Sequence, residues 1–257
     1  MAYASKLPDE TGFYDYTADE QLVWGELFDR QIAFLKGRIC SEYLEGVALL
    51  GLKAASVPQL REVDKRLGEL TNFGVEGVPA IIPPSQFYTL LADRKFPVAT
   101  FLRRREDMDY IEEPDLFHEV FGHCPLLTNQ AYTDFIEAFG KIAVELGKGY
   151  RWHLFRLFWF TIEFGMINTP DGLRGYGAGV ASSPSEAEFA CSGKAVYTPA
   201  DLMTMLRTPY RIDIVQPQYF VIDSFEDLPK LLETDLKTAI DEAKALGDLP
   251  ALFEKAA

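Results

Sequence analysis

The segment PDLFHEVFGHCPL, which covers residues 114–126, contains two of the three histidines in this chain of 257 residues. His118 and His123 are five positions apart, whereas the zinc-protease motif H-E-x-x-H places its histidines four apart. On a straight α-helix, a separation of five turns two side chains about 140° away from each other. Both rings can therefore reach one metal ion only if the helix does not continue straight between them.

Gly122 supplies a place where the helix can stop. We expect a helix that begins near Pro114 and ends at Gly122 in a left-handed C-cap, with Pro125 preventing its continuation. His123 then turns back beneath His118. A pair of buried, hydrogen-bonded structural histidines is the alternative, but a metal site is the simplest reason for gathering two residues of so scarce a type.

Glu163 is the expected third ligand. It lies within WFTIEFG, residues 159–165, in an apolar run that predicts a helix buried on every side. An ionised carboxylate in such surroundings is costly unless a charged group pairs with it. Two histidines and one carboxylate leave three positions open on an octahedral ion, as in non-heme Fe(II) oxygenases. A zinc hydrolase with Glu119 as its base is the alternative.

The composition indicates one acidic globular domain. Hydrophobic residues make up 48% of the chain, and 39 Asp and Glu against 25 Lys and Arg give a formal charge of −14. Nucleic acids and anionic membranes require a basic surface, so we expect neither as a partner. Residues 1–16 lack the apolar core of a signal peptide and the three cysteines lack a C-x-x-C spacing, so we expect a cytoplasmic protein with reduced thiols.

The sequence patterns predict a mainly α (α+β) fold with a few short strands. Thr17 and Glu20 form a capping-box pattern at the start of the first helix. Further elements are expected as helices over residues 128–146 and 152–167, strands over 96–102, 195–197 and 218–222, and loops over the Gly- and Pro-rich segments 74–84 and 169–185.

Three motifs, in this order, resemble the pterin-dependent aromatic amino acid hydroxylases: PDLFHEVFGHCPL (114–126), WFTIEFG (159–165) and YGAGVASS (176–183). The resemblance implies a mainly helical iron domain that hydroxylates the ring of Phe, Tyr or Trp with O₂ and tetrahydrobiopterin. The chain is most similar to short bacterial members that convert L-phenylalanine to L-tyrosine, and tryptophan is the alternative substrate. We expect an N-terminal extension over residues 1–15 and a catalytic iron- and pterin-binding domain over 16–257.

The resemblance also implies roles for individual residues. Fe(II) is expected on His118, His123 and Glu163. Arg103 is expected to hold the substrate carboxylate with help from the Ser182 hydroxyl. The residues expected to shape the pocket for the aromatic side chain are Pro114, Trp159, Phe164 and Gly179.

On the pterin side, the resemblance implies that Phe87 stacks on the ring system and that Glu119 and Phe158 lie beside it. The backbone of Ala80, Ile81 and Ile82 is expected to supply hydrogen bonds to the pterin. Asp115 is expected to hold the ring and tautomer of a histidine ligand.

The same resemblance bears on assembly. About 15 residues precede the first predicted helix, and the tail after Leu232 lacks the heptads of a coiled coil. We therefore expect a monomer, or at most a weak dimer, without the regulatory domain of animal relatives.

Overall fold

The chain folds mainly into helices, and the computed structural model describes residues 3–79 and 81–254. The α-helices are α1 (Ala18–Leu35), α2 (Ser41–Leu49), α3 (Leu60–Thr71), α4 (Pro84–Ala92), α5 (Gln130–Leu146), α6 (Arg151–Phe158), α7 (Ala178–Ser182), α8 (Pro184–Ala190), α9 (Leu202–Arg207), α10 (Asp227–Lys230) and α11 (Leu236–Leu246). The described residues also form the π-helices η2 (Phe117–His123) and η5 (Trp159–Glu163) and the 3₁₀-helices η1 (Arg105–Asp107), η3 (Cys124–Thr128) and η4 (Lys148–Tyr150).

The strands are short: β1 (Gly74–Val78), β2 (Lys95–Ala99), β3 (Met166–Thr169), β4 (Gly172–Gly175), β5 (Val196–Pro199) and β6 (Gln218–Ile222). β1 and β2 pair in parallel, and the other four form a sheet of order β4-β3-β6-β5 in which only β3 and β4 are antiparallel neighbours. The mainly helical α+β class expected from the sequence is confirmed.

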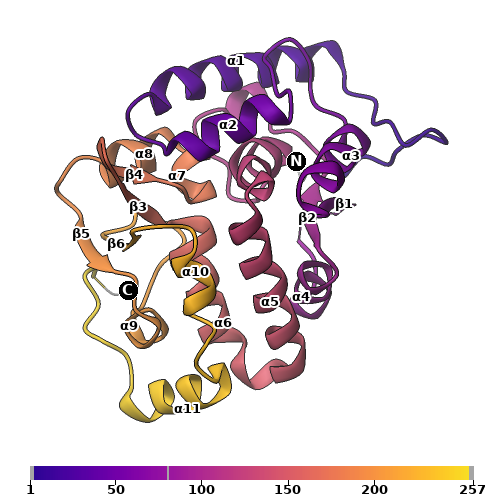
Figure 1. Ribbon diagram of the computed structural model, residues 1–257. Coiled ribbons are helices and arrows are strands. Elements are labelled where there is room, and N and C mark those ends of the chain that lie inside the picture. Colours follow the sequence, from indigo (N-terminus) through magenta and orange to yellow (C-terminus); the bar gives the residue numbers. More distant parts are fainter. Residues whose placement is uncertain (1–2, 80, 255–257) are drawn as a thin grey trace.

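Helix α5 runs through the middle of the molecule, between the two sheets (Figure 1). The π-helix η2 contacts β2 of the small sheet, whereas η5 contacts β6 of the large one, and α7 contacts both π-helices. The two segments that carry the predicted metal ligands thus contact different sheets and share contacts with α7.

The N-terminal segment is held against the chain ahead of Arg103. Thr100 Oγ1 accepts from Lys6 N at 2.9 Å and donates to Lys6 O at 2.8 Å, and the Tyr3 ring stacks on Phe101 at 4.8 Å. Helix α1 follows with the capping box that the sequence predicts at Thr17.

Two segments expected to be loops contain regular structure. Residues 74–84 include β1, in which Val75 and Val78 are buried and pair with β2. Residues 169–185 include β4 and α7. Glycine and proline lower the local propensity for strand and helix, but burial and pairing with a neighbouring strand outweigh that preference here.

The helix expected over residues 152–167 is also shorter than predicted. It ends at Glu163, and Met166 and Ile167 belong to β3. A Cβ atom at Gly165 would lie 2.0 Å from the Tyr176 ring, so the chain after η5 packs against Tyr176 at a distance that only glycine allows.

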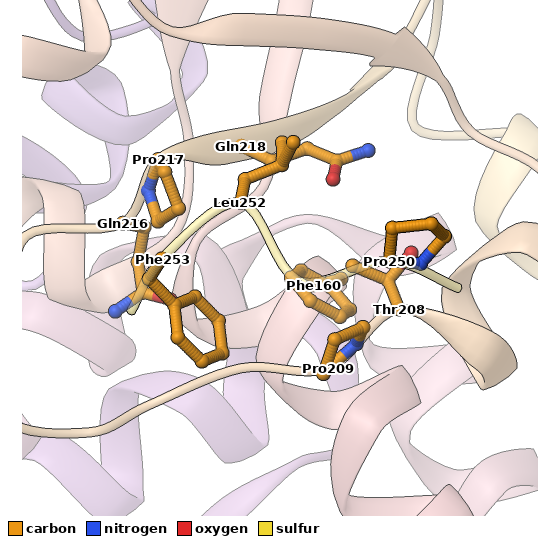
Figure 2. Close-up of a pocket in the computed structure, with 9 residues that line it drawn as sticks. All are labelled: Phe160, Thr208, Pro209, Gln216, Pro217, Gln218, Pro250, Leu252 and Phe253. Atoms are coloured by element: carbon orange, nitrogen blue, oxygen red, sulfur yellow. The ribbon is translucent and has the colours of Figure 1, made fainter. Parts of the chain in front are cut away.

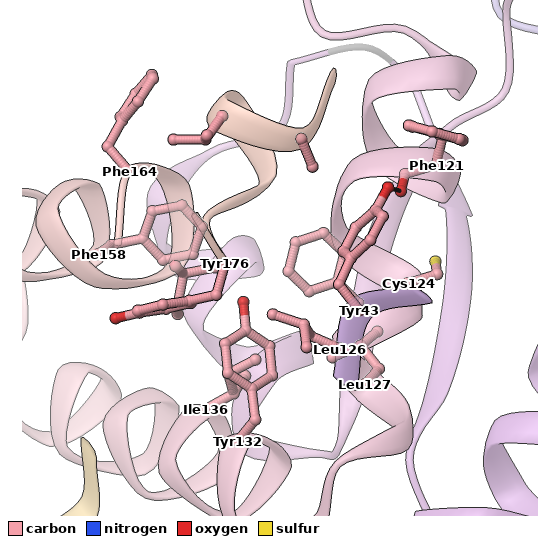
Figure 3. Close-up of a cluster of buried hydrophobic side chains, with 14 of the residues drawn as sticks. Tyr43, Phe121, Cys124, Leu126, Leu127, Tyr132, Ile136, Phe158, Phe164 and Tyr176 are labelled. Carbon is pink, nitrogen blue, oxygen red and sulfur yellow. Dashed lines mark hydrogen bonds between the residues drawn. The ribbon is translucent and has the colours of Figure 1, made fainter. Parts of the chain in front are cut away.

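Buried aromatic side chains support the metal-site segment (Figure 3). The Tyr43 hydroxyl from α2 donates to the carbonyl of Phe121 in η2. Tyr132 from α5 meets Tyr176 edge to face at 6.5 Å. Among the residues that the structure describes, no helix combines the length and the apolar character that crossing a membrane requires.

Candidate active site

The π-helix η2 explains how two histidines five positions apart can face the same point. In a π-helix each N–H bonds to the carbonyl five residues earlier, so residues five apart lie one turn above each other on the same face. His118 and His123 have this separation within η2. The expected C-cap at Gly122 is wrong, because the chain continues through this residue as a π-helix.

Glu163 is presented in the same way by η5, where Phe164 N donates to Trp159 O at 2.9 Å. His123 Nε2 lies 3.2 Å from His118 Nε2 and 2.9 Å from Glu163 Oε1, and His118 Nε2 lies 3.5 Å from the same oxygen. Ligand bonds of about 2.1 Å that meet at about 90–110° separate their ligand atoms by about 3.0–3.4 Å. The three residues therefore have the donor types and the separations that a divalent metal ion requires.

Ser182 fixes the tautomer of His118. Its Oγ lies 2.9 Å from His118 Nδ1 and donates its own proton to Ala178 O at 2.8 Å. With that proton committed, the hydroxyl accepts from Nδ1–H, so Nε2 is the nitrogen that faces Glu163 and that binds a metal ion once it has lost its proton. This contact differs from the substrate-carboxylate role expected for Ser182.

The electrostatics keep Glu163 ionised. Burial alone would raise the pKa of its carboxyl, but His123 and His118 hold that pKa well below its usual range. Burial works in the opposite direction on His118, yet the Glu163 carboxylate raises the pKa of this imidazole to about 9. Glu119 lies 3.9 Å from His123 Nε2, and burial raises the pKa of its carboxyl to about 8.

Arg103 and Asp115 form a buried ion pair beside the histidines. Arg103 Nε and Nη2 donate to the two Asp115 oxygens at 2.9 and 2.8 Å, and the side chains are 8% and 0% exposed. Asp115 Oδ1 also accepts from the backbone N of His118 at 3.1 Å. Asp115 thus contacts His118 through the backbone N, whereas Ser182 contacts the Nδ1 atom of the His118 ring. The role expected for Asp115 at the ring of a histidine ligand stays a prediction. The Nη1 group of Arg103 takes no part in the hydrogen bonds to Asp115.

Three of the residues expected to shape the substrate pocket, Trp159, Phe164 and Gly179, lie together at η5. The Trp159 and Phe164 rings lie 4.6 Å apart, with Phe164 directly after the ligand Glu163. A Cβ atom at Gly179 would lie 2.5 Å from Phe164, so glycine is needed for this ring to lie where it does. Pro114 is half-buried next to Asp115.

On the other side of the site, aromatic rings lead away from His123. The Phe158 ring lies 6.3 Å from the His123 ring, and Phe87 meets Phe158 edge to face at 5.2 Å. Ile81 is exposed and Ile82 is half-buried at the start of the segment that leads into α4. Ala80 lies outside the described residues.

Three contacts escaped the sequence reasoning. Tyr210 stacks on Trp159 at 4.6 Å, the side-chain oxygen of Gln216 accepts from the Trp159 indole at 2.9 Å, and the Phe96 ring lies 4.5 Å from His123. Their positions in β2 and in the connection from α9 to β6 carry no local sequence signal for this site.

Comparisons with known proteins agree with this geometry. The family model described as biopterin-dependent aromatic amino acid hydroxylase matches residues 1–241. A phenylalanine-4-hydroxylase of Pseudomonas aeruginosa is 44% identical over 98% of this chain and 96% of its own length. The apo structure of the cold-active phenylalanine hydroxylase from Colwellia psychrerythraea 34H is 48% identical, with a TM-score of 0.94 over 97% of both chains.

A metal-containing structure is similar as well. Phenylalanine hydroxylase from Chromobacterium violaceum with bound Fe(III) is 39% identical and has a TM-score of 0.90 over 98% of this chain and 91% of the other. The match of the family model to nearly the whole chain, together with these relatives, shows that this chain belongs to the biopterin-dependent aromatic amino acid hydroxylases.

Proposed function

We propose that this chain is a monooxygenase that converts L-phenylalanine to L-tyrosine, with O₂ and tetrahydrobiopterin or a related reduced pterin as co-substrates. Fe(II) is held by His118, His123 and Glu163. The observation that carries the proposal is the meeting of His118 Nε2, His123 Nε2 and Glu163 Oε1 at separations of 2.9–3.5 Å in a wall of aromatic side chains.

The side chains of this protein position the metal ligands and the substrate. Ser182 holds the His118 ring in the tautomer whose Nε2 can bind a metal. Asp115 fixes the Arg103 guanidinium, whose remaining N–H groups bind the substrate carboxylate. Bound Fe(II), together with the reduced pterin, supplies the activation of O₂ that a protein side chain cannot provide.

The pocket residues set the substrate ring over the metal. Trp159, Phe164 and Pro114 line it, and Gly179 leaves the room that the Phe164 ring requires. Apolar walls of this kind exclude water, which limits the loss of oxidant to side reactions.

The pterin lies on the side of Phe87 and Phe158. Phe87 is half-buried, so part of its ring remains accessible for contact with a pterin. The backbone at residues 80–82 supplies the polar contacts, and Glu119 lies at the boundary between the pterin and the metal. Support for this arrangement is the aromatic contact that links Phe87, Phe158 and His123.

An assay with three amino acids tests the proposal. Phe, Trp and Tyr are each supplied at equal concentration with O₂, a reduced pterin and Fe(II), and the products are separated by chromatography. We expect tyrosine from phenylalanine as the main product, with Zn(II) unable to replace Fe(II). Preferential hydroxylation of tryptophan, or no hydroxylation of any of the three amino acids with Fe(II) and a reduced pterin, would contradict the proposal.

We also infer a cytoplasmic monomer. Cys40, Cys124 and Cys191 are free thiols, which is typical of a reducing compartment. Helix α11 buries Leu236, Ala239, Ile240 and Ala243 inside its own chain, so its apolar face is already used. Sedimentation analysis should give a single species of about the chain mass of 29.0 kDa, and a stable tetramer would contradict the inference.

A further inference from the structure

Gln216 makes a fully satisfied set of side-chain hydrogen bonds beside the substrate pocket. Its Oε1 accepts from the Trp159 indole N–H at 2.9 Å, and its Nε2 donates to the carbonyls of Arg211 and Ile214, both at 2.9 Å. The residue is 2% exposed. Both amide hydrogens and the amide oxygen are therefore used, which leaves the side chain one orientation.

The same residue ties down the segment that covers the indole. Residues 208–217 connect α9 to β6, and within them the Tyr210 ring stacks on Trp159 at 4.6 Å with an interplanar angle of 29°. The two Gln216 amide hydrogens donate to carbonyls within the same segment, those of Arg211 and Ile214, and so hold the segment in a compact turn. Gln216 thus fixes the indole directly at its N–H and indirectly through the ring stacked upon it.

Gln216 is itself anchored from two sides. Its backbone N donates to Glu186 Oε1 at 3.1 Å, and the second Glu186 oxygen accepts from the Tyr219 hydroxyl at 2.7 Å. Gln216 lines a small pocket together with Leu252 and Phe253, among other residues (Figure 2). The cavity left between them has a volume of about 10 Å³, room for no more than about one water molecule, so Gln216 has little space in which to reorient.

We propose that Gln216 is a positioning residue, which sets the orientation of the Trp159 indole and thereby the fit of the substrate's aromatic ring. The inference rests on the proposed function, in which Trp159 lines the substrate pocket. Trp159 lies 4.6 Å from Phe164, and Phe164 follows the ligand Glu163 directly. A rotation of the Trp159 indole about its side-chain bonds would therefore displace the Phe164 ring, which lines the proposed substrate pocket next to the metal ligand Glu163.

The test is a double-mutant cycle on Gln216 and Trp159, with a matched control. Gln216→Met keeps the volume and removes the amide, whereas Trp159→Phe keeps a ring and removes the N–H donor. Gln218→Met is the control, because Gln218 is two residues away and donates to Thr198 Oγ1 at 2.9 Å, on β5.

Gln216→Met removes all three side-chain hydrogen bonds of Gln216. We expect it to raise KM for phenylalanine about tenfold, the size expected from loss of the bond to the Trp159 indole alone, with less change in kcat. In Gln216→Met, the KM for the pterin stays at the wild-type value, and so does the iron content. In Gln218→Met, the KM for phenylalanine stays within about twofold of wild type. In the Trp159→Phe background the effect of Gln216→Met on KM for phenylalanine is smaller than in the wild-type background, because the hydrogen bond to the indole is already absent and only the indirect contact through Tyr210 remains. Full additivity of the two changes would overturn the proposal.

A second readout does not depend on activity. The indole N–H resonance of Trp159, assigned by its absence in Trp159→Phe, should shift and exchange faster with solvent in Gln216→Met. An unchanged resonance overturns the proposal, as does a shifted resonance with unchanged KM. If Gln216→Met does not fold, Trp159→Phe alone must raise KM for phenylalanine, and an unchanged KM overturns the proposal. Absence of tyrosine formation by the wild-type protein would instead count against the proposed function.

Discussion

The Ser182 hydroxyl lies 2.9 Å from Nδ1 of His118, on the side of the ring opposite the metal-facing nitrogen. Because its proton is donated to Ala178 O, the hydroxyl acts as an acceptor toward the ring. Partners of this kind orient a histidine ligand and raise its basicity. The Ser182 hydroxyl therefore contacts one of the proposed metal ligands, and the role at the substrate carboxylate that the resemblance implies stays a prediction.

Ser182→Ala should weaken iron binding by about 10- to 100-fold, because His118 loses the partner that fixes its tautomer. Titration of the metal-free protein with Fe(II) under anaerobic conditions measures the affinity. Ser185→Ala, an exposed serine in the adjacent helix, is the control and should bind iron like the wild type. Equal affinity in Ser182→Ala would show that the hydrogen bond has no role in metal binding.

Asp115→Asn should destabilise the fold by about 3 kcal/mol, because it leaves the buried Arg103 guanidinium without its counter-charge. The same change should raise KM for phenylalanine, since Arg103 loses its fixed orientation. Urea denaturation and steady-state kinetics measure the two effects.

Asp109→Asn is the control for Asp115→Asn. Asp109 also pairs with an arginine, Arg30, but its side chain is 95% exposed. Its removal should therefore change stability by less than about 1 kcal/mol. Similar losses in both variants would contradict a special role for the buried pair.

Gly179→Ala should displace the Phe164 ring, because the added Cβ would lie 2.5 Å from it. Overpacking of this kind costs about 1–3 kcal/mol, and here it also narrows the substrate pocket. KM for phenylalanine should rise more than KM for the pterin. Gly149→Ala, where a Cβ meets no atom within 4 Å, should leave both constants unchanged.

Glu186 should make the stability of the protein depend on pH. Burial raises the pKa of this carboxyl from 4.5 to about 7, against the hydrogen bonds from Tyr219 and Gln216. The folded protein then binds the proton more tightly than the unfolded chain, so the contribution of Glu186 to the free energy of unfolding falls as pH rises from about 4.5 to about 7.

Glu186→Gln removes this titration. The stability of the variant relative to wild type should therefore increase between pH 4.5 and pH 8, as measured by urea denaturation at both values. Glu188→Gln controls for the loss of one carboxylate from α8. A difference that stays constant or decreases with pH would contradict the placement of Glu186 in a buried, proton-retaining environment.

The sequence predicts which residues meet, but not how the backbone brings them together. His118, His123 and Glu163 are recognisable as ligand types in scarce or apolar surroundings. The π-helices that align them are not, because a helix of seven residues carries too few positions for its period to be distinguished from that of an α-helix. Gly122, expected as a helix end, instead lets η2 approach α7, since a Cβ there would lie 3.0 Å from the Ala178 carbonyl.

Contacts between residues far apart in the sequence are a second feature that could not be predicted from the sequence. Gln216 and Trp159 are 57 positions apart and lie on different elements, so no local pattern pairs them. The same holds for the strand that contains Val75. The glycine-rich sequence around Val75 predicts a loop, but this segment forms a strand because it pairs with β2. Both depend on tertiary packing, which local propensity does not encode.

The measurement that tests the account most directly is iron content and tyrosine formation in wild type and Glu163→Gln. The amide keeps the shape of the carboxylate and removes its charge, and Glu145→Gln on the exposed face of α5 is the matched control. Wild type and Glu145→Gln should retain iron and form tyrosine from phenylalanine with a reduced pterin, whereas Glu163→Gln should lose both. Normal iron content and tyrosine formation in Glu163→Gln would contradict the assignment of the metal site.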